Sequence, residues 1–282
     1  MNTRVLDLLD GLEIEADGIY SSVLPAPASQ ADEVREREDV ARRTTDLLPE
    51  IARHHSIPVM EREVRAFLGD VPAHGVVADV GGGWAWHWRR LDVERPDVSV
   101  VVVDFVRENL RHAARVLGAL VNQQVFLVHG DATKLPFPSS VFDGYWSVQA
   151  LQHIPDFEQA VTEAHRVLQP GGQFACYSLN RARLIEFTYR FMRRPYHVRG
   201  KRPGGYFLAR GSSHEAGVVE HVFRSPVVTR YSEVMFHPDF RLHTGEAASW
   251  IGRADRYLSS SLPLFAWMAR QRSFHVTKRA HT

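Results

Sequence analysis

The sequence lacks features that define several classes of protein. Its single cysteine, Cys176, excludes an internal disulfide, and the surrounding Gln-Phe-Ala-Cys-Tyr-Ser is typical of a strand, so we expect a buried, inert thiol. No stretch approaches the roughly twenty apolar residues of a membrane-spanning helix. The first residues also lack the apolar core of a signal peptide. We therefore expect a cytoplasmic protein without a membrane span.

The chain has almost no net charge: +1 over 282 residues. With 44% hydrophobic and 24% charged residues, the composition is that of a globular protein with a sizeable core. The charge is nevertheless uneven: residues 181–210 contain nine Lys/Arg against one Glu, and residues 1–50 contain twelve Asp/Glu against five Lys/Arg. No compact spacing of histidines suits a metal, so we expect no metal site.

Three consecutive glycines follow a short apolar run. The run from Val76 to Val80 includes Asp79, and Gly81, Gly82 and Gly83 come next. Glycine permits a positive φ and the close approach of a ligand, and a helix N-terminus after it offers N–H groups to an anion. This stretch predicts a nucleotide-binding turn at the end of a strand.

The chain around this turn alternates between strand and helix patterns. We expect strands at 75–80, 98–103, 124–129, 141–147 and 173–179, and helices at 84–91, 106–118 and 156–168. This alternation predicts a doubly wound α/β sheet. Before it, the pattern predicts a short helix at 5–9, a small hairpin over 12–20 and helices over 31–54 and 58–68. After it come a basic, aromatic insertion at 181–225, a helix at 226–236 and strands at 239–244 and 273–279.

Polar residues lie at the ends of the first four predicted strands. Ligands bind outside the carboxyl ends of the strands in such sheets. Asp104 lies about twenty residues beyond the glycines, where a carboxylate can accept both hydroxyls of a ribose. An acceptor at Asp131 suits the amine of an adenine, and Asp79 suits an ammonium group. The expected ligand is therefore a nucleoside that carries a cation.

Six motifs resemble those of class I S-adenosylmethionine-dependent methyltransferases. They are Asp-x-Gly-x-Gly at 79–83, Asp104, Gly-Asp-Ala at 130–132, Phe-Asp at 142–143, Gln-His-Ile-Pro-Asp at 152–156 and Leu-x-Pro-Gly-Gly at 168–172. Their order and spacing are most similar to the small-molecule branch that includes ubiquinone/menaquinone-biosynthesis methyltransferases. The similarity covers about residues 75–180.

The resemblance implies a fold and a division of the chain. The fold is a Rossmann-like seven-stranded sheet whose last strand is antiparallel and lies between strands five and six. The expected parts are an N-terminal helical extension (1–70), a cofactor-binding core (71–180), a lid-like basic insertion after strand five (181–225) and the C-terminal part of the sheet (226–282).

The resemblance also implies S-adenosylmethionine as cofactor and a set of residues that bind it. Asp79 and the glycines would hold its methionine part, Asp104 its ribose, Asp131 and Ala132 its adenine, and Ser147 the sulfonium side. The complete predicted set is Asp79, Gly81, Gly82, Gly83, Asp104, Phe105, Asp131, Ala132, Ser147 and Val148. Ala85 stands where the family has a third glycine, and Trp84, Trp86 and Trp88 surround His87.

The sequence leaves the chemistry beyond the cofactor open. His153 is the candidate general base, because histidine titrates near neutrality and this one follows the fourth strand; the alternative is a histidine that bonds locally at a helix start. In-line positioning can by itself supply much of the acceleration of methyl transfer. The expected acceptor is small or lipid-linked, and anionic if the arginines contact it. An RNA methyltransferase that uses the arginine-rich insertion and a non-catalytic S-adenosylmethionine-binding or regulatory protein are the alternatives.

Overall fold

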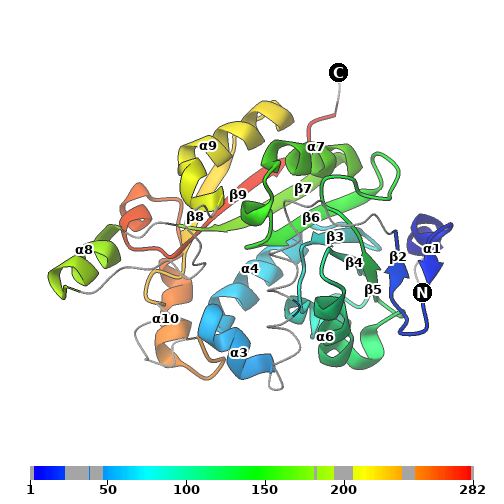
Figure 1. Ribbon diagram of the computed structural model, residues 1–282, viewed down its shortest axis with the longest axis horizontal. Helices are drawn as coiled ribbons and strands as arrows, with labels where there is room; N and C mark the ends of the chain where they lie inside the picture. Colours follow the sequence, from blue (N-terminus) through cyan, green and yellow to red (C-terminus); the bar gives the residue numbers. More distant parts are fainter. Residues whose placement is uncertain are drawn as a thin grey trace.

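The chain folds around one mixed β-sheet that helices cover on both faces (Figure 1). The computed structural model describes residues 3–22, 38, 47–180, 183–193, 206–236 and 245–280. Over these residues the sheet has nine strands in the order β1-β2-β5-β4-β3-β6-β7-β9-β8. The predicted α/β class is confirmed, and the sheet is wider than the expected seven strands.

Five parallel strands form the centre of the sheet. They are β3 (Val76–Val80), β4 (Ser99–Asp104), β5 (Val125–His129), β6 (Phe142–Val148) and β7 (Leu168–Leu179). Every residue of β3 and β4 is buried. Because helices lie on both faces, these strands consist of nearly unbroken apolar runs instead of alternating apolar and polar residues. Four of these strands were predicted within one residue, whereas β7 begins five residues before its predicted start at 173.

Two apolar clusters lie on the two faces of the sheet. On one face, α7 (Phe157–Val167) and α9 (Tyr206–Phe223) contribute residues such as Val161 and Phe223. On the other face, α4 (Ile57–Asp70), the 3-10 turn η1 (Trp86–Trp88) and α6 (Arg107–Leu117) contribute residues such as Phe67, Trp88 and Leu110. The single predicted helix over 84–91 is in fact η1 followed by the short α5 (Leu91–Glu94).

The first residues extend the sheet at the β5 edge. After α1 (Thr3–Leu9), the predicted hairpin is present as β1 (Glu13–Ile14) and β2 (Tyr20–Ser21), which pair antiparallel. Strand β2 then pairs parallel with β5, so that Ser21 lies opposite His129. The N-terminal hairpin therefore ends at the carboxyl edge of the central strands.

The C-terminal part of the chain completes the other edge. Strand β9 (Gln271–Thr277) is antiparallel to both β7 and β8 (Val228–Ser232) and lies between them. The prediction of a helix over 226–236 was wrong, because β8 occupies its centre. The β-branched run Val227-Val228-Thr229 favours a strand.

The remaining helices and 3-10 turns lie between these elements along the chain. They are α3 (Leu47–His54), α8 (Arg183–Phe191), α10 (Trp250–Leu258) and the 3-10 turns η2 (Gly118–Leu120), η3 (Leu151–His153) and η4 (Pro263–Trp267). Of the predicted helix over 31–54 the structure describes α3, and the predicted strand at 239–244 lies outside the described residues. Among the described helices, none is long and apolar enough to cross a membrane.

Candidate functional site

The glycine turn follows β3 directly and has a conformation that requires glycine. Gly81 and Gly83 have φ values of +70° and +56°. A Cβ on Gly81 would lie 2.1 Å from the Cβ of Ala150, and one on Gly82 would lie 2.5 Å from Asp79 Oδ2. A Cβ on Gly83 would meet no atom within 4 Å. The turn is therefore packed beneath its first two glycines and open above the third, where a ligand can approach the backbone.

Asp104 joins the glycine turn to the next strand. Its Oδ2 accepts a hydrogen bond of 2.8 Å from Gly83 N, and its Oδ1 accepts one of 2.8 Å from Val106 N. Asn109 Nδ2 donates to the same Oδ1 at 3.3 Å. A carboxylate offers about four acceptor positions, so bonds to a further hydroxyl are compatible with these contacts. The structure thus brings Asp104 and the glycines together at one sheet edge, as predicted.

Asp79 lies beneath the turn and is buried. Trp88 Nε1 donates to Asp79 Oδ2 at 2.7 Å. Burial raises the pKa of this carboxyl to about 7, the hydrogen bond from Trp88 lowers it, and the charge of Asp104 raises it further. Its side chain therefore supports the turn from inside the protein. The indole N–H of Trp88 is a contact that sequence reasoning missed.

Ala85 occupies the place of the family's third glycine. It has a φ of +51°, is fully buried, and donates its N–H to Gly82 O at 2.8 Å. A left-handed conformation costs a non-glycine residue roughly 1 kcal/mol. The chain keeps the glycine-like backbone at this position and adds a methyl group to the core.

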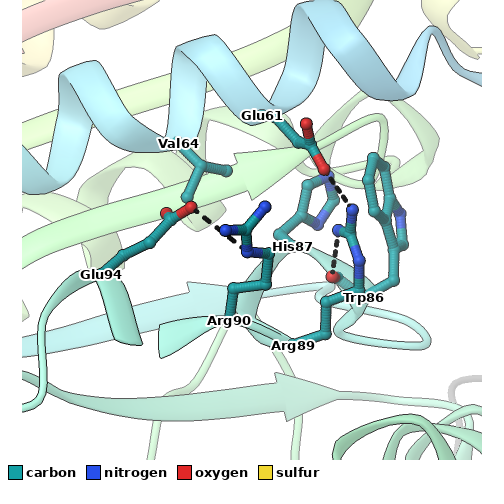
Figure 2. Close-up of a pocket in the computed structure, with 7 residues that line it drawn as sticks. All are labelled: Glu61, Val64, Trp86, His87, Arg89, Arg90 and Glu94. Carbon is teal, nitrogen blue, oxygen red and sulfur yellow. Dashed lines mark hydrogen bonds and ion pairs between the residues drawn. The ribbon is translucent and has the colours of Figure 1, made fainter. Parts of the chain in front are cut away.

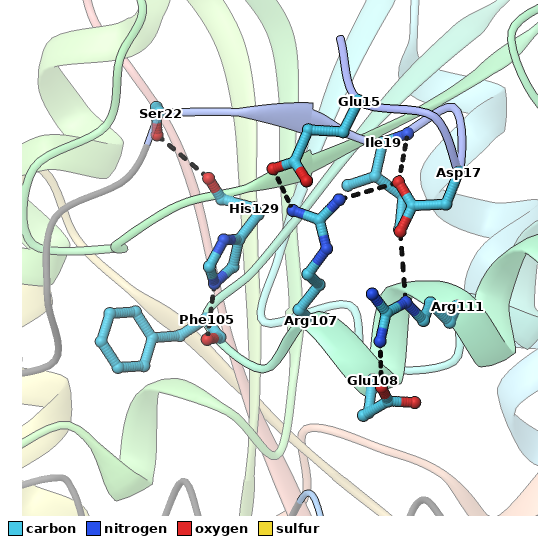
Figure 3. Close-up of polar contacts among 9 residues, drawn as sticks. All are labelled: Glu15, Asp17, Ile19, Ser22, Phe105, Arg107, Glu108, Arg111 and His129. Carbon is cyan, nitrogen blue, oxygen red and sulfur yellow. Dashed lines mark hydrogen bonds and ion pairs between the residues drawn. The ribbon is translucent and has the colours of Figure 1, made fainter. Parts of the chain in front are cut away.

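Phe105 follows the end of β4 and Asp131 follows the end of β5, and both lie near the N-terminal hairpin. Asp131 Oδ1 accepts from Thr133 N and Thr133 Oγ1, both at 2.8 Å, which is a side-chain turn. Figure 3 shows His129 between the two segments: its Nε2 lies 3.2 Å from Phe105 O, and Ser22 Oγ donates to His129 O at 3.1 Å. Ala132 beside Asp131 is buried. His129 and Ser22 were not among the predicted residues.

Arg107 and Arg111 hold the hairpin against α6 (Figure 3). Arg107 bonds to Glu15 at 2.6 Å and to Asp17 at 2.8 Å, and Arg111 bonds to Asp17 at 3.1 Å. The acidic surplus of the first fifty residues was visible in the sequence, but nothing local in the sequence indicates these partners. The ion pairs keep the hairpin beside the segment that contains Phe105.

Ser147 and Val148 end the fourth strand beside the turn. Ser147 is buried and donates from Oγ to Val80 O at 2.7 Å, so its hydroxyl bonds to the strand that precedes the glycines. Val148 is half-buried. The next residue, Gln149, has a φ of +52° and donates its N–H to Tyr177 O at 2.7 Å. Residues 147–149 therefore stay hydrogen-bonded to β7 up to the sheet edge, where the left-handed Gln149 turns the chain.

His153 follows in η3 and is half-buried. Gln152 Oε1 accepts from Leu179 N at 2.6 Å, which fixes the orientation of its amide. Gln152 Nε2 then points at His153 Nε2 over 3.1 Å and donates to it. In this arrangement Nε2 uses its lone pair and Nδ1 carries the proton. The geometry matches the local-bonding alternative for His153.

The segment after the turn packs tightly against α4 (Figure 2). His87 stacks on Trp86 with ring centroids 4.2 Å apart and lies 5.9 Å from the ring of Trp146. Burial lowers the pKa of His87 to about 3, so its imidazole is neutral. Arg89 forms an ion pair with Glu61 of α4 and donates to Trp86 O. Trp86 and Trp88 are buried in the apolar cluster on this face of the sheet.

Part of the chain is similar in sequence to known proteins. Residues 78–176 match the family described as "Methyltransferase domain". The chain is 36% identical over 101 residues to the demethylmenaquinone methyltransferase of Listeria welshimeri, a match that covers 36% of this chain and 43% of that relative. The chain therefore spans less than half the length of this curated relative.

Solved structures share the fold over a longer part of the chain. A chain from the complex between the Haloferax volcanii Trm112 methyltransferase activator and a methyltransferase has a TM-score of 0.56 and 16% identity, over 87% of this chain and 98% of that chain. Phosphoethanolamine N-methyltransferase 2 of Haemonchus contortus, solved with S-adenosyl-L-methionine, has a TM-score of 0.51 and 17% identity, over 78% of this chain and 53% of that chain. These likenesses show the fold.

Proposed function

We propose that this chain, which carries a domain of the class I S-adenosylmethionine-dependent methyltransferase superfamily, transfers a methyl group from that cofactor to a small or lipid-linked acceptor. The family match and a structural neighbour with bound S-adenosyl-L-methionine support the cofactor. The contact that carries the proposal is the 2.8 Å bond from Gly83 N to Asp104, since it joins the open glycine turn to a carboxylate at the end of β4.

The residues at the carboxyl edge suit the parts of this cofactor. Gly81, Gly82 and Gly83 would hold its methionine part with backbone groups, and Asp104 would accept from its ribose. Phe105, Asp131 and Ala132 would contact the adenine, and Ser147 and Val148 would border the sulfonium. Asp79 would act on the amino group through the turn that it supports, because its carboxyl is buried beneath the glycines.

The chemistry requires mainly positioning by the protein. When bound, S-adenosylmethionine supplies a methyl group on a cationic sulfur that an acceptor displaces in line. The chain would orient the cofactor through Asp104 and the glycine turn, and would exclude water with α4 and η1, which Arg89 and Glu61 hold together. Alignment of donor and acceptor can supply a large part of the acceleration.

We place the acceptor near the carboxyl ends of β6 and β7, where His153 is the candidate base. The named relative acts on a demethylmenaquinone, and we propose an acceptor of the same kind, an apolar ring on a lipid-like tail. To accept a proton, Nε2 of His153 must give up its bond from Gln152. We therefore propose that His153 accepts a proton only once the bound acceptor has displaced this bond, and that alignment of donor and acceptor supplies most of the acceleration.

Calorimetry with S-adenosylhomocysteine tests the cofactor site. We expect Asp104→Asn to weaken binding about tenfold, because a carboxylate bonds more strongly to hydroxyls than an amide does. Asp70→Asn, an exposed position at the end of α4, is the control and should bind as the unchanged protein does. Thermal unfolding without ligand checks that both variants fold.

Equal binding by all three proteins would contradict the assignment of Asp104. An absence of binding by the unchanged chain would contradict the proposed function itself. Transfer of a radiolabelled methyl group to a demethylated naphthoquinone, with and without a prenyl tail, then tests the acceptor class.

A further inference from the structure

Helix α8 presents an exposed apolar face. Leu184, Phe187 and Phe191 lie at helical spacing on one side, and Phe191 is 81% exposed. Tyr189 on the opposite side is buried and anchors the helix to the protein. Figure 1 shows α8 at the left end of the view, projecting from the rest of the chain. An exposed apolar helix face of this kind marks an interaction surface.

The turn η4 continues this surface. Leu262, Leu264 and Trp267 are each more than half exposed, with Leu264 at 72%. The guanidinium of Arg183 lies 5.9 Å from the ring centroid of Trp267, which places the start of α8 beside the end of η4. We name the six exposed apolar side chains of α8 and η4 the apolar patch: Leu184, Phe187, Phe191, Leu262, Leu264 and Trp267.

The apolar patch lies at the carboxyl edge of the sheet. Helix α8 follows the end of β7, and η4 precedes the start of β9, where Leu179 pairs with Gln271. Asn180 Nδ2 donates to Ala266 O and Ala269 O, both at 2.8 Å, which fixes η4 to the end of β7. The proposed cofactor turn opens at this same edge, so the apolar patch flanks the side from which an acceptor would arrive.

Positive charge surrounds the apolar patch. Arg183, Arg190 and Arg193 of the α8 segment are exposed, against the single Glu186. A surface pocket of about 330 Å³ lies next to η4 and is lined by Arg62, Glu63, Ala66, Arg230 and the three serines 259–261. Glu63 is buried and bonds to Arg62 and to the hydroxyl of Tyr177.

Because of Arg230, this pocket has a surplus of positive charge. Among the described residues it has no carboxylate partner within ion-pair distance, whereas Arg62 is paired with Glu63. Burial lowers the pKa of Arg62; the nearby charges of Arg230 and Arg256 act in the same direction, and those of Tyr177 and Asp255 oppose them. Ser259 Oγ is buried without a hydrogen-bond partner among the described residues. These groups suit a phosphate.

We propose that the apolar patch docks on the surface of an anionic phospholipid bilayer, with a lipid phosphate in the pocket of Arg62, Arg230 and the serines. Exposed aromatic and aliphatic side chains beside arginines are typical of segments that lie in the interface of a membrane. A protruding helix enters a deformable bilayer readily, whereas a rigid partner would need a matching groove. A second copy in a symmetric dimer would bring the same arginines face to face.

Sedimentation with vesicles tests this proposal. We expect the chain to sediment with vesicles of phosphatidylcholine and phosphatidylglycerol, and about tenfold less with phosphatidylcholine alone. The double variant Phe187→Ser/Phe191→Ser should bind the anionic vesicles about tenfold more weakly. The matched control is Val93→Ser, which removes a side chain that is 71% exposed on α5 and should leave binding unchanged.

The headgroup pocket has its own variant and control. Arg230→Gln should weaken binding to anionic vesicles about fivefold, while Arg115→Gln, an exposed arginine of α6, should not. Thermal unfolding identifies any variant that fails to fold, and Phe187→Leu, which keeps the apolar character, should retain binding.

Three results would overturn the proposal. The first is stabilisation by inorganic phosphate that depends on Arg230 without any vesicle binding, which would mean a site for a free anion. The second is a dimer in light scattering that Phe187→Ser/Phe191→Ser abolishes. The third is equal binding by the double variant and Val93→Ser. Vesicle binding needs no methyl transfer, so a failure of vesicle binding would not contradict the proposed function, which has its own test. Only the direction from which the acceptor arrives rests on the proposed function.

Discussion

At the scale of one residue, Asp79 shows that the place of a residue in the chain does not determine where its side chain points. The sequence predicted that it precedes the glycine turn, and it does. The structure turns its carboxyl inward to Trp88, nine residues later along the chain. Ser147 likewise bonds to Val80 O. Both partners depend on how the segments pack, so the residue type and its place at a strand end were predictable while the direction of the side chain was not.

The raised pKa of Asp79 makes the stability of the fold depend on pH. Its ordinary value is 3.8 and burial raises the pKa to about 7 in the folded chain, so the folded state keeps a proton that the unfolded state has lost. The contribution is complete at low pH and is lost as the pH rises through about 7. Over about three units this amounts to roughly 4 kcal/mol as an upper bound.

We therefore predict that Asp79→Asn removes this pH dependence. The free energy of unfolding of the unchanged chain should fall more steeply between about pH 5 and about pH 8 than that of the variant, by up to roughly 3 kcal/mol. Urea denaturation at several pH values measures the difference. Asp70→Asn, whose carboxyl is exposed, should follow the unchanged chain. If the free energy of unfolding of Asp79→Asn changes with pH as that of the unchanged chain does, the buried carboxyl does not titrate in this range.

At the scale of elements, strands inside the sheet were easier to predict than those at its edge. The runs that form β3 to β7 are apolar because both faces are covered, and their glycine and proline boundaries are local signals. Strand β8 was mistaken for a helix because most of its residues are not buried and its pairing with β9 comes from distant residues. Helix α9 was included in the basic insertion, yet Val219 and Phe223 belong to the core.

The ion pairs between the hairpin and α6 give the prediction at this scale. Arg107→Ala removes the bonds to Glu15 and Asp17 and should lower the free energy of unfolding by about 1 kcal/mol, since all three side chains are partly exposed. The loss should shrink in high salt. Arg115 on the same helix has no such carboxylate partner among the residues that the structure describes, so Arg115→Ala is the control. A double-mutant cycle with Asp17→Ala measures the coupling, and zero coupling would mean that the pair of Arg107 and Asp17 does not hold the hairpin.

At the scale of the whole molecule, Glu233 joins the N-terminal helices to the last strands. It is fully buried after β8, accepts from Ser56 N at 2.8 Å, and is paired with Arg270 just before β9. Residues 56 and 233 lie far apart in the sequence, so neither the pair nor its burial was predictable from local pattern. The contact connects the start of α4 to the edge of the sheet formed by β8 and β9.

Arg270 tests whether this connection stabilises the whole fold. Burial raises the pKa of Glu233, and the charge of Arg270 opposes that rise. Arg270→Ala leaves the carboxyl buried without its cation and should lower the free energy of unfolding by roughly 3–5 kcal/mol, whereas Arg270→Ala with Glu233→Gln should recover part of the loss. Chemical denaturation of the single and double variants measures both. If the double variant is no more stable than the single one, the pair of Glu233 and Arg270 does not hold the N-terminal helices against the last strands. The packing of α10 on α4 would then hold them.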